Sequence, residues 1–85
     1  MVTLNPKAEY LLGVRRLIKE IYSKLGGRQE ELVIIHSSQF FKVKRADKEV
    51  TIVQSIFDDY FGDKRREAQE GSIEKIQENL KNLLV

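Results

Sequence analysis

The fold is decided by residues 32–53, which read LVIIHSSQFFKVKRADKEVTIV. Three short runs in this stretch are rich in β-branched and aromatic residues, a composition typical of strands, and polar residues separate them. The runs cover residues 32–35, 40–44 and 50–53. The link Ala46-Asp47-Lys48 is short enough for an antiparallel hairpin, although it lacks the Asn-Gly or Asp-Gly pair favoured in such turns. The stretch therefore predicts a three-stranded antiparallel sheet.

Side-chain alternation assigns the second run to two faces of this sheet. Phe41 and Val43 fall on one face, and Phe40, Lys42 and Lys44 fall on the other. If the Phe41 face meets the rest of the domain, both lysines point outward. The first run is apolar without interruption, which predicts that this strand is covered more completely than its neighbours.

A long amphipathic helix is predicted ahead of the sheet. Apolar residues recur there at steps of three and four, which predicts a helix over residues 6–25. Asn5 suits the N-cap, and Gly26 with Gly27 can supply the backbone conformation that ends a helix. Gly13 in the interior costs about 1 kcal/mol relative to alanine, and it predicts the close approach of another element.

The helical period returns near the end of the chain. The apolar side of the last segment consists of Ile73, Ile76, Leu80, Leu83 and Leu84. Its start is predicted at Asp63 or at Ser72, depending on whether Gly71 breaks the helix. Residues 54–62 suit a strand or a single helical turn equally well, so their conformation stays open.

Length limits the architecture to one domain over residues 1–85, because a chain of 85 residues lacks the apolar material for a second core. Two amphipathic helices and three strands bury their apolar sides most simply in two layers. We therefore expect an α+β fold in the order α-β-β-β-α, with a three-stranded antiparallel sheet and both helices on one of its faces.

Composition excludes several classes of function. The chain is 41% hydrophobic and 33% charged, as in folded globular proteins, and it has no cysteine for disulfides, thiolate metal sites or thiol catalysis. No stretch approaches the roughly 18–20 apolar residues of a membrane span, and residues 1–8 lack the pattern of a signal peptide. We expect a cytoplasmic protein with no membrane partner and no cofactor.

Catalysis has a single imidazole candidate, because His36 is the only histidine. In a strand His36 shares a face with Ser38, but no acid that would orient the imidazole accompanies the pair. The acidic residues Asp58, Asp59 and Asp63 lack the spacing of a calcium loop and are better explained as solvated or capping residues. We therefore expect neither an enzyme nor a metal site.

Charge is distributed unevenly along the chain. Residues 1–48 carry ten Lys and Arg against five Asp and Glu, whereas residues 49–85 carry five against eight. An excess of base in one region favours binding of an anionic partner. Lys64, Arg65 and Arg66 add a basic cluster at the expected start of the last helix, where unpaired N–H groups also favour an anion. A solvated turn balanced by nearby glutamates explains the same cluster.

Several of these residues resemble the pattern of the double-stranded-RNA-binding domain. That family has the order α-β-β-β-α, a histidine shortly before a phenylalanine in the first strand connection, and a Lys-Lys-x-x-Lys run that opens the last helix. Here His36 precedes Phe40 by four positions, and Arg65-Arg66-Glu67-Ala68 is similar to the basic run. Gln69 stands in place of its last lysine, and the expected Gly-Pro before the histidine is absent.

The resemblance implies a binding mode for structured RNA, whose shape is read through phosphates and 2′-hydroxyls across the minor groove. Lys64, Arg65 and Arg66 would then hold phosphates, and His36 would enter a minor groove. Together with Lys42 and Lys44 of the second strand, these are the predicted nucleic-acid-binding residues.

Exposed aromatic residues favour a second class of function. Phe40, Tyr60 and Phe61 are the candidates for the apolar centre of a protein interface, either with another protein or in a homodimer. The sequence therefore predicts a small binding module and leaves open whether the partner is a nucleic acid or a protein.

Overall fold

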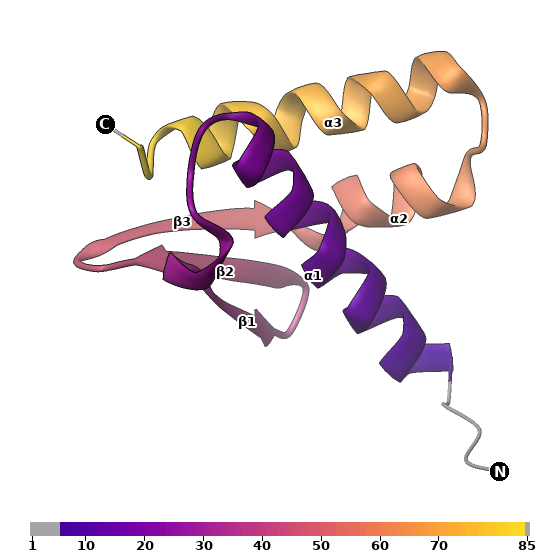
Figure 1. The fold of residues 1–85 in the computed structure, drawn as a ribbon. Helices are drawn as coiled ribbons and strands as arrows, with labels where there is room; N and C mark the ends of the chain where they lie inside the picture. Colours follow the sequence, from indigo (N-terminus) through magenta and orange to yellow (C-terminus); the bar gives the residue numbers. More distant parts are fainter. Residues whose placement is uncertain (1–5, 85) are drawn as a thin grey trace, which may run out of the picture.

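The computed structural model describes residues 6–84, which form one two-layer unit (Figure 1). In chain order the elements are the helix α1 (Pro6–Lys24), the short 3₁₀ helix η1 (Gln29–Glu31), the strands β1 (Val33–Ser37), β2 (Phe40–Arg45) and β3 (Lys48–Val53), and the helices α2 (Gln54–Gly62) and α3 (Arg66–Lys81). This is an α+β fold in the α-β-β-β-α order expected from the sequence, with α2 as an additional helix.

The three strands form one antiparallel sheet in the order β1-β2-β3. Ser37 pairs with Phe40 across the first two-residue turn, and Arg45 pairs with Lys48 across the second. Neither turn contains glycine, and Ala46 in the second turn has a φ of 54°, in the left-handed region. The hairpin predicted between the second and third runs is thus confirmed.

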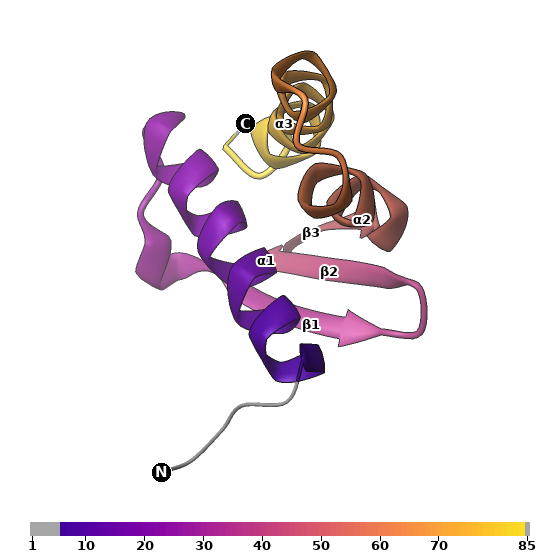
Figure 2. The same cartoon turned by 90° about the vertical axis from the view of Figure 1, so that its right-hand side faces the viewer.

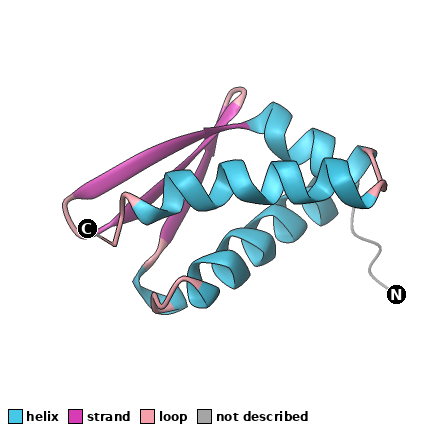
Figure 3. Ribbon diagram, turned by 90° about the horizontal axis from the view of Figure 1, so that it is seen from above, coloured by secondary structure: helices cyan, strands magenta, loops and turns pink. Residues whose placement is uncertain are grey.

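All three helices lie on the same side of the sheet or at its end, as two views at right angles show (Figures 1 and 2). Seen from above, α1 and α3 run beside each other across the sheet (Figure 3). The buried apolar core lies between these helices and the sheet. It consists of Val14, Leu17, Ile18, Ile21, Tyr22, Leu32, Phe41, Val43, Ile52, Phe57, Ile76, Leu80 and Leu83.

The predicted faces of β2 are confirmed, but the prediction for the first strand is wrong. Phe41 and Val43 are buried against the helices, and Lys42 and Lys44 project from the opposite face. On β1, by contrast, Val33 is 56% exposed and Ile35 is 40% exposed. The physical reason is that β1 is an edge strand and the helices cover only one face of the sheet, so alternate residues of its apolar run face solvent.

The conformations that the sequence left open are helical. Residues 54–62 form α2, and α3 begins at Arg66 and continues through Gly71 without a break. Gly13 does mark a close approach, because a Cβ added there would lie 3.3 Å from Cζ of Phe61. The first helix ends at Lys24, and Gly26 has a φ of +98°, as a helix stop requires. Asn5, the predicted N-cap, lies outside the described residues.

Candidate functional site

One face of the sheet carries no helix, and we call it the open sheet face. The strand register and alternation place nine residues on it: Val33, Ile35, Ser37, Phe40, Lys42, Lys44, Glu49, Thr51 and Val53. The underside of the sheet in Figure 1 is this face. Antiparallel sheets commonly leave one face to solvent, but such a face is then usually polar. The open sheet face departs from this pattern in part, because four of its nine residues are apolar.

Aliphatic side chains account for much of the open sheet face. Val33, Ile35 and Val53 are three of the five large apolar residues that are exposed among the described residues, and Val53 is 52% exposed. Phe40 adds a half-buried ring directly opposite Val53 in the register. Val33 and Ile35 lie on one edge strand and Val53 on the other, so apolar surface reaches both edges. Several exposed apolar residues on one face mark an interaction surface more often than a single exposed leucine does.

Two lysines occupy the central strand of this face. Lys42 lies opposite Ile35 on one side and Thr51 on the other, and Lys44 lies between Val33 and Glu49. The Lys42 ammonium stands 5.8 Å from the centre of the Phe40 ring, a cation–π distance. Among residues 6–84 neither lysine forms an ion pair. The open sheet face is therefore apolar toward its edges and positively charged along its middle.

The other predicted nucleic-acid-binding cations lie elsewhere. Lys64, Arg65 and Arg66 are exposed at the link between α2 and α3, in the helical layer on the other side of the sheet (Figure 2). Arg65 binds Asp63 through Nη2 at 2.8 Å, and Arg66 binds Glu70 through Nε at 3.0 Å. The structure thus does not bring these residues together with Lys42 and Lys44.

The Asp63 carboxylate forms hydrogen bonds with Arg65 within this link. The Arg65 side chain and backbone N–H both donate to it, which lowers the pKa of Asp63 from its ordinary 3.8 to about 2. The same contact raises the pKa of the Arg65 guanidinium. Asp63 therefore stays ionised and holds Arg65 in a local turn.

His36 faces the helices. Its ring stacks on Phe41 with centroids 4.6 Å apart, and Nε2 lies 2.9 Å from Oε1 of Gln54 at the start of α2. The half-buried imidazole thus links β1 to α2 and points away from the open sheet face.

The aromatic candidates divide between two places. Phe40 belongs to the open sheet face, whereas Phe61 packs edge-on against Tyr60 and Tyr10. The Tyr10 hydroxyl donates to Asp58 at 2.6 Å, and burial together with this carboxylate raises the pKa of Tyr10. Phe61 is 38% exposed, but its ring also closes the contact between α2 and Gly13 of α1. Tyr60 and Phe61 therefore join helices and are not part of the patch around Phe40.

A small hollow beside β1 is lined by two cations that were not among the binding residues predicted from the sequence. It measures about 140 Å³ and is lined by Arg15 and Lys19 of α1 with Leu32 and Ile34. No acid is among these residues, and among residues 6–84 neither cation forms an ion pair. The only signal in the sequence was the excess of base in the first half of the chain.

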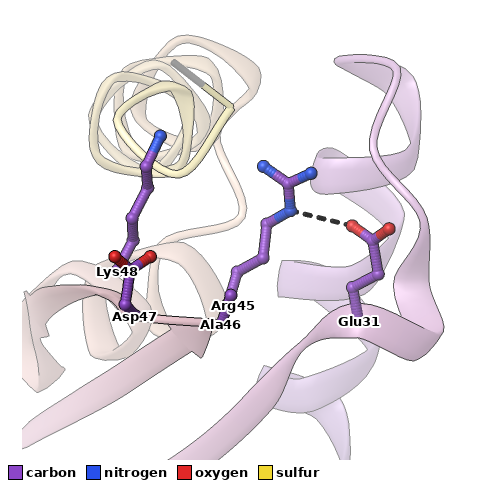
Figure 4. A pocket seen from close by; sticks show the side chains of 5 residues that line it. All are labelled: Glu31, Arg45, Ala46, Asp47 and Lys48. Carbon is purple, nitrogen blue, oxygen red and sulfur yellow. Dashed lines mark hydrogen bonds and ion pairs between the residues drawn. The ribbon is translucent and has the colours of Figure 1, made fainter.

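Another hollow, about 440 Å³, lies at the same end of the sheet, beside the β2–β3 turn, and is lined by Glu31, Arg45, Ala46, Asp47 and Lys48 (Figure 4). Arg45 has a structural role there, because its Nε donates a hydrogen bond to Glu31 at 2.9 Å and its Nη1 donates one to the Leu83 carbonyl at 2.7 Å. These bonds fasten the β2–β3 hairpin to η1 and to the segment that follows α3.

Within the described part of the chain, no three His, Asp or Glu side chains are grouped so that they could hold a metal ion. No helix there combines the length and apolar character needed to cross a bilayer. Comparisons of the chain with protein-family models, curated proteins and solved structures found no match. Function is therefore inferred from the geometry of the surface.

Proposed function

We propose that this domain is a protein-interaction module that binds an acidic protein partner through the open sheet face. The observation that carries the proposal is the exposure of Val33, Ile35 and Val53 on one uncovered face. Burying aliphatic surface contributes roughly 25 cal/mol per Å², which makes such a face a favourable contact area. Lys42 and Lys44 in its middle select a partner of complementary charge.

A protein partner fits this surface better than a nucleic acid. Polynucleotide binding gains most of its affinity from cations along the phosphate backbone, and single strands add stacking on several aromatic rings. The open sheet face offers two lysines, one glutamate and one aromatic ring. The RNA-binding mode implied by the family resemblance would use Arg65, Arg66 and His36, which in this fold contact Asp63, Glu70 and Phe41.

A second copy of this chain fits less well than a different protein. Two open sheet faces packed together would oppose two Lys42–Lys44 pairs near the centre of the interface, with only the two Glu49 side chains to balance them. Like charges in an apolar interface cost free energy unless they are paired. An acidic partner removes this cost.

Site-specific photocross-linking in cells that express the protein tests the proposal. A benzophenone amino acid replaces Thr51, which is exposed on the open sheet face, and a control protein carries it at Glu78, which is exposed on α3. We expect a discrete cross-linked protein from position 51 only. The yield should fall with Lys42→Glu/Lys44→Glu and persist with Lys75→Glu/Lys81→Glu, which changes the net charge equally on α3.

Three results would overturn the proposal. They are a cross-link to nucleic acid, a cross-link only to a second copy of the chain, and a cross-link from position 51 that survives the Lys42→Glu/Lys44→Glu change. Gel-shift titration with duplex RNA, duplex DNA and single strands gives an independent check, in which we expect no retardation at physiological salt. Retardation that is lost in Arg65→Glu/Arg66→Glu would favour the RNA-binding alternative.

A further inference from the structure

The outer edge of β1 has free backbone hydrogen-bonding groups, and the register identifies them. Ser37 and Phe40 flank a two-residue turn, so they exchange hydrogen bonds, and bonded pairs then alternate along the antiparallel ladder. The N–H and C=O groups of Val33, Ile35 and Ser37 therefore point toward β2. Those of Ile34 and His36 point away from the sheet, where no described strand pairs with them.

The β1 strand itself lacks three features that often protect an edge strand: a charged residue, a proline and a bulge. Proteins block such edges with charged residues, proline or a bulge, because an open edge pairs with other chains. β1 reads VIIHS, without a charged residue or proline, and its register with β2 is unbroken. The other edge strand, β3, carries Lys48 and Glu49. Of the two edge strands, β1 is therefore the one that can pair more readily with an added strand.

The side chains around β1 determine what kind of strand fits. Residues that face each other across a ladder point to the same face, so the residue opposite Ile34 would point toward the hollow lined by Arg15 and Lys19. Residues opposite Val33 and Ile35 would lie on the open sheet face beside two exposed aliphatic side chains. Acidic residues suit the first position, and apolar residues suit the other two.

We infer that an extended segment of the partner, with alternating acidic and apolar residues, adds to β1 as a fourth strand. This inference rests on the proposed function, since it assigns the contact that the acidic partner makes. Backbone bonds to Ile34 and His36 give the affinity, and Arg15 and Lys19 give the preference for acid. The β1 strand of a second copy carries no acidic residue, so it would leave these cations without partners.

A synthetic octapeptide of alternating valine and glutamate, capped at both ends, is a direct probe. We expect fluorescence anisotropy to detect binding that weakens with salt, as exposed charge pairs do. Arg15→Glu/Lys19→Glu should weaken binding, and Lys75→Glu/Lys81→Glu on α3 should leave it unchanged. A peptide with lysine in place of glutamate should not bind.

Two N-methylated forms of the peptide isolate the backbone contact. In an added antiparallel strand, the orientation that we assign, the glutamate N–H groups would face Ile34 and His36, and the valine N–H groups would face solvent. Methylation of the glutamate amides should therefore reduce affinity roughly tenfold or more, as the loss of two or more hydrogen bonds predicts, and methylation of the valine amides should have little effect. In NMR exchange experiments the peptide should slow the Ile34 and His36 amides.

The outcomes separate this inference from the proposal on which it rests. If the two methylated peptides bind equally, or if the Ile34 and His36 amides exchange as fast with peptide as without it, strand addition is wrong. The proposed function fails separately, by the cross-linking results at position 51. Failure of the peptide to bind, or a dimer in sedimentation that protects the same two amides without peptide, would also overturn strand addition.

Discussion

Substitution of Gly27 by alanine should destabilise the domain, because the Cβ would collide with a buried ring. Gly27 follows α1, and its N–H donates to the Tyr22 carbonyl at 3.0 Å. A Cβ at this position would lie 2.2 Å from Cε2 and 2.4 Å from Cζ of Tyr22, more than 1 Å inside ordinary contact distance. Tyr22 is fully buried in the core, so its ring cannot move away into solvent.

The expected magnitude comes from two opposing effects. Overpacking of a well-packed core costs typically about 1–3 kcal/mol. Alanine also restricts the unfolded chain more than glycine does, which returns about 0.4–1 kcal/mol. The midpoints of the two ranges, about 2 and about 0.7 kcal/mol, leave a net loss in the free energy of unfolding of about 1.3 kcal/mol. For a domain of this length such a loss lowers the Tm by roughly 5–10 °C.

Urea unfolding of matched glycine variants measures this effect. Gly71 in α3 is the control, because an added Cβ there has no neighbour within 4 Å and the residue is helical. Gly71→Ala should raise stability by about 0.5–1 kcal/mol through helix propensity. In a Tyr22→Leu background, Gly27→Ala should cost less, because the two ring atoms nearest to the added Cβ, Cε2 and Cζ, are gone. A Gly27→Ala protein as stable as the wild type would show that the Tyr22 ring does not resist the added Cβ.

Three further predictions concern other sites. NMR titration should give Asp63 a pKa of about 2, and Arg65→Ala should move this pKa toward 3.8. Because the native pKa is depressed, the stabilisation by this contact is present above about pH 4 and is lost toward pH 2. A pKa of Asp63 that Arg65→Ala leaves unchanged would contradict the assignment. Phe57→Ala should lower the free energy of unfolding in urea by about 3–5 kcal/mol, because the Phe57 ring is fully buried. Phe61→Ala should lower it by about 1–2 kcal/mol, because Phe61 is partly exposed. The reverse order would be inconsistent with this core. Ala46→Gly should raise the free energy of unfolding by about 0.5–1 kcal/mol, because the φ of 54° at position 46 suits glycine. A loss of stability would show that this turn is unstrained.

Part of the candidate surface could be predicted from the sequence, because it depends on local alternation. The spacing of Phe41 and Val43 is enough to place Lys42 and Lys44 on the opposite face, and the length of the link that follows them is enough to predict the hairpin. The exposure of Val33 and Ile35 was not predictable in this way. An uninterrupted apolar run has no period, so it cannot show which of its residues a second layer will cover.

The cationic residues illustrate the same division. Lys64, Arg65 and Arg66 were expected at the start of the last helix; Arg66 is its first residue, Arg65 is its N-cap, and Lys64 precedes it in the link. Whether they belong with Lys42 and Lys44 depended on which face of the sheet the helices cover, a property of packing between distant segments. The hollow containing Arg15 and Lys19 likewise arises only because α1 crosses beside the edge strand, 14 or more residues later in the chain.

Short-range periodicity was enough to predict α1, the three strands, the apolar side of α3 and the inward face of β2. Which sheet face stays open, which edge stays unpaired and which cations remain without an acid among the described residues became visible only in the folded domain. The physical reason is that backbone and side-chain preferences act over a few residues, whereas burial, edge pairing and charge neutralisation are set by contacts between segments that meet only when the chain has folded.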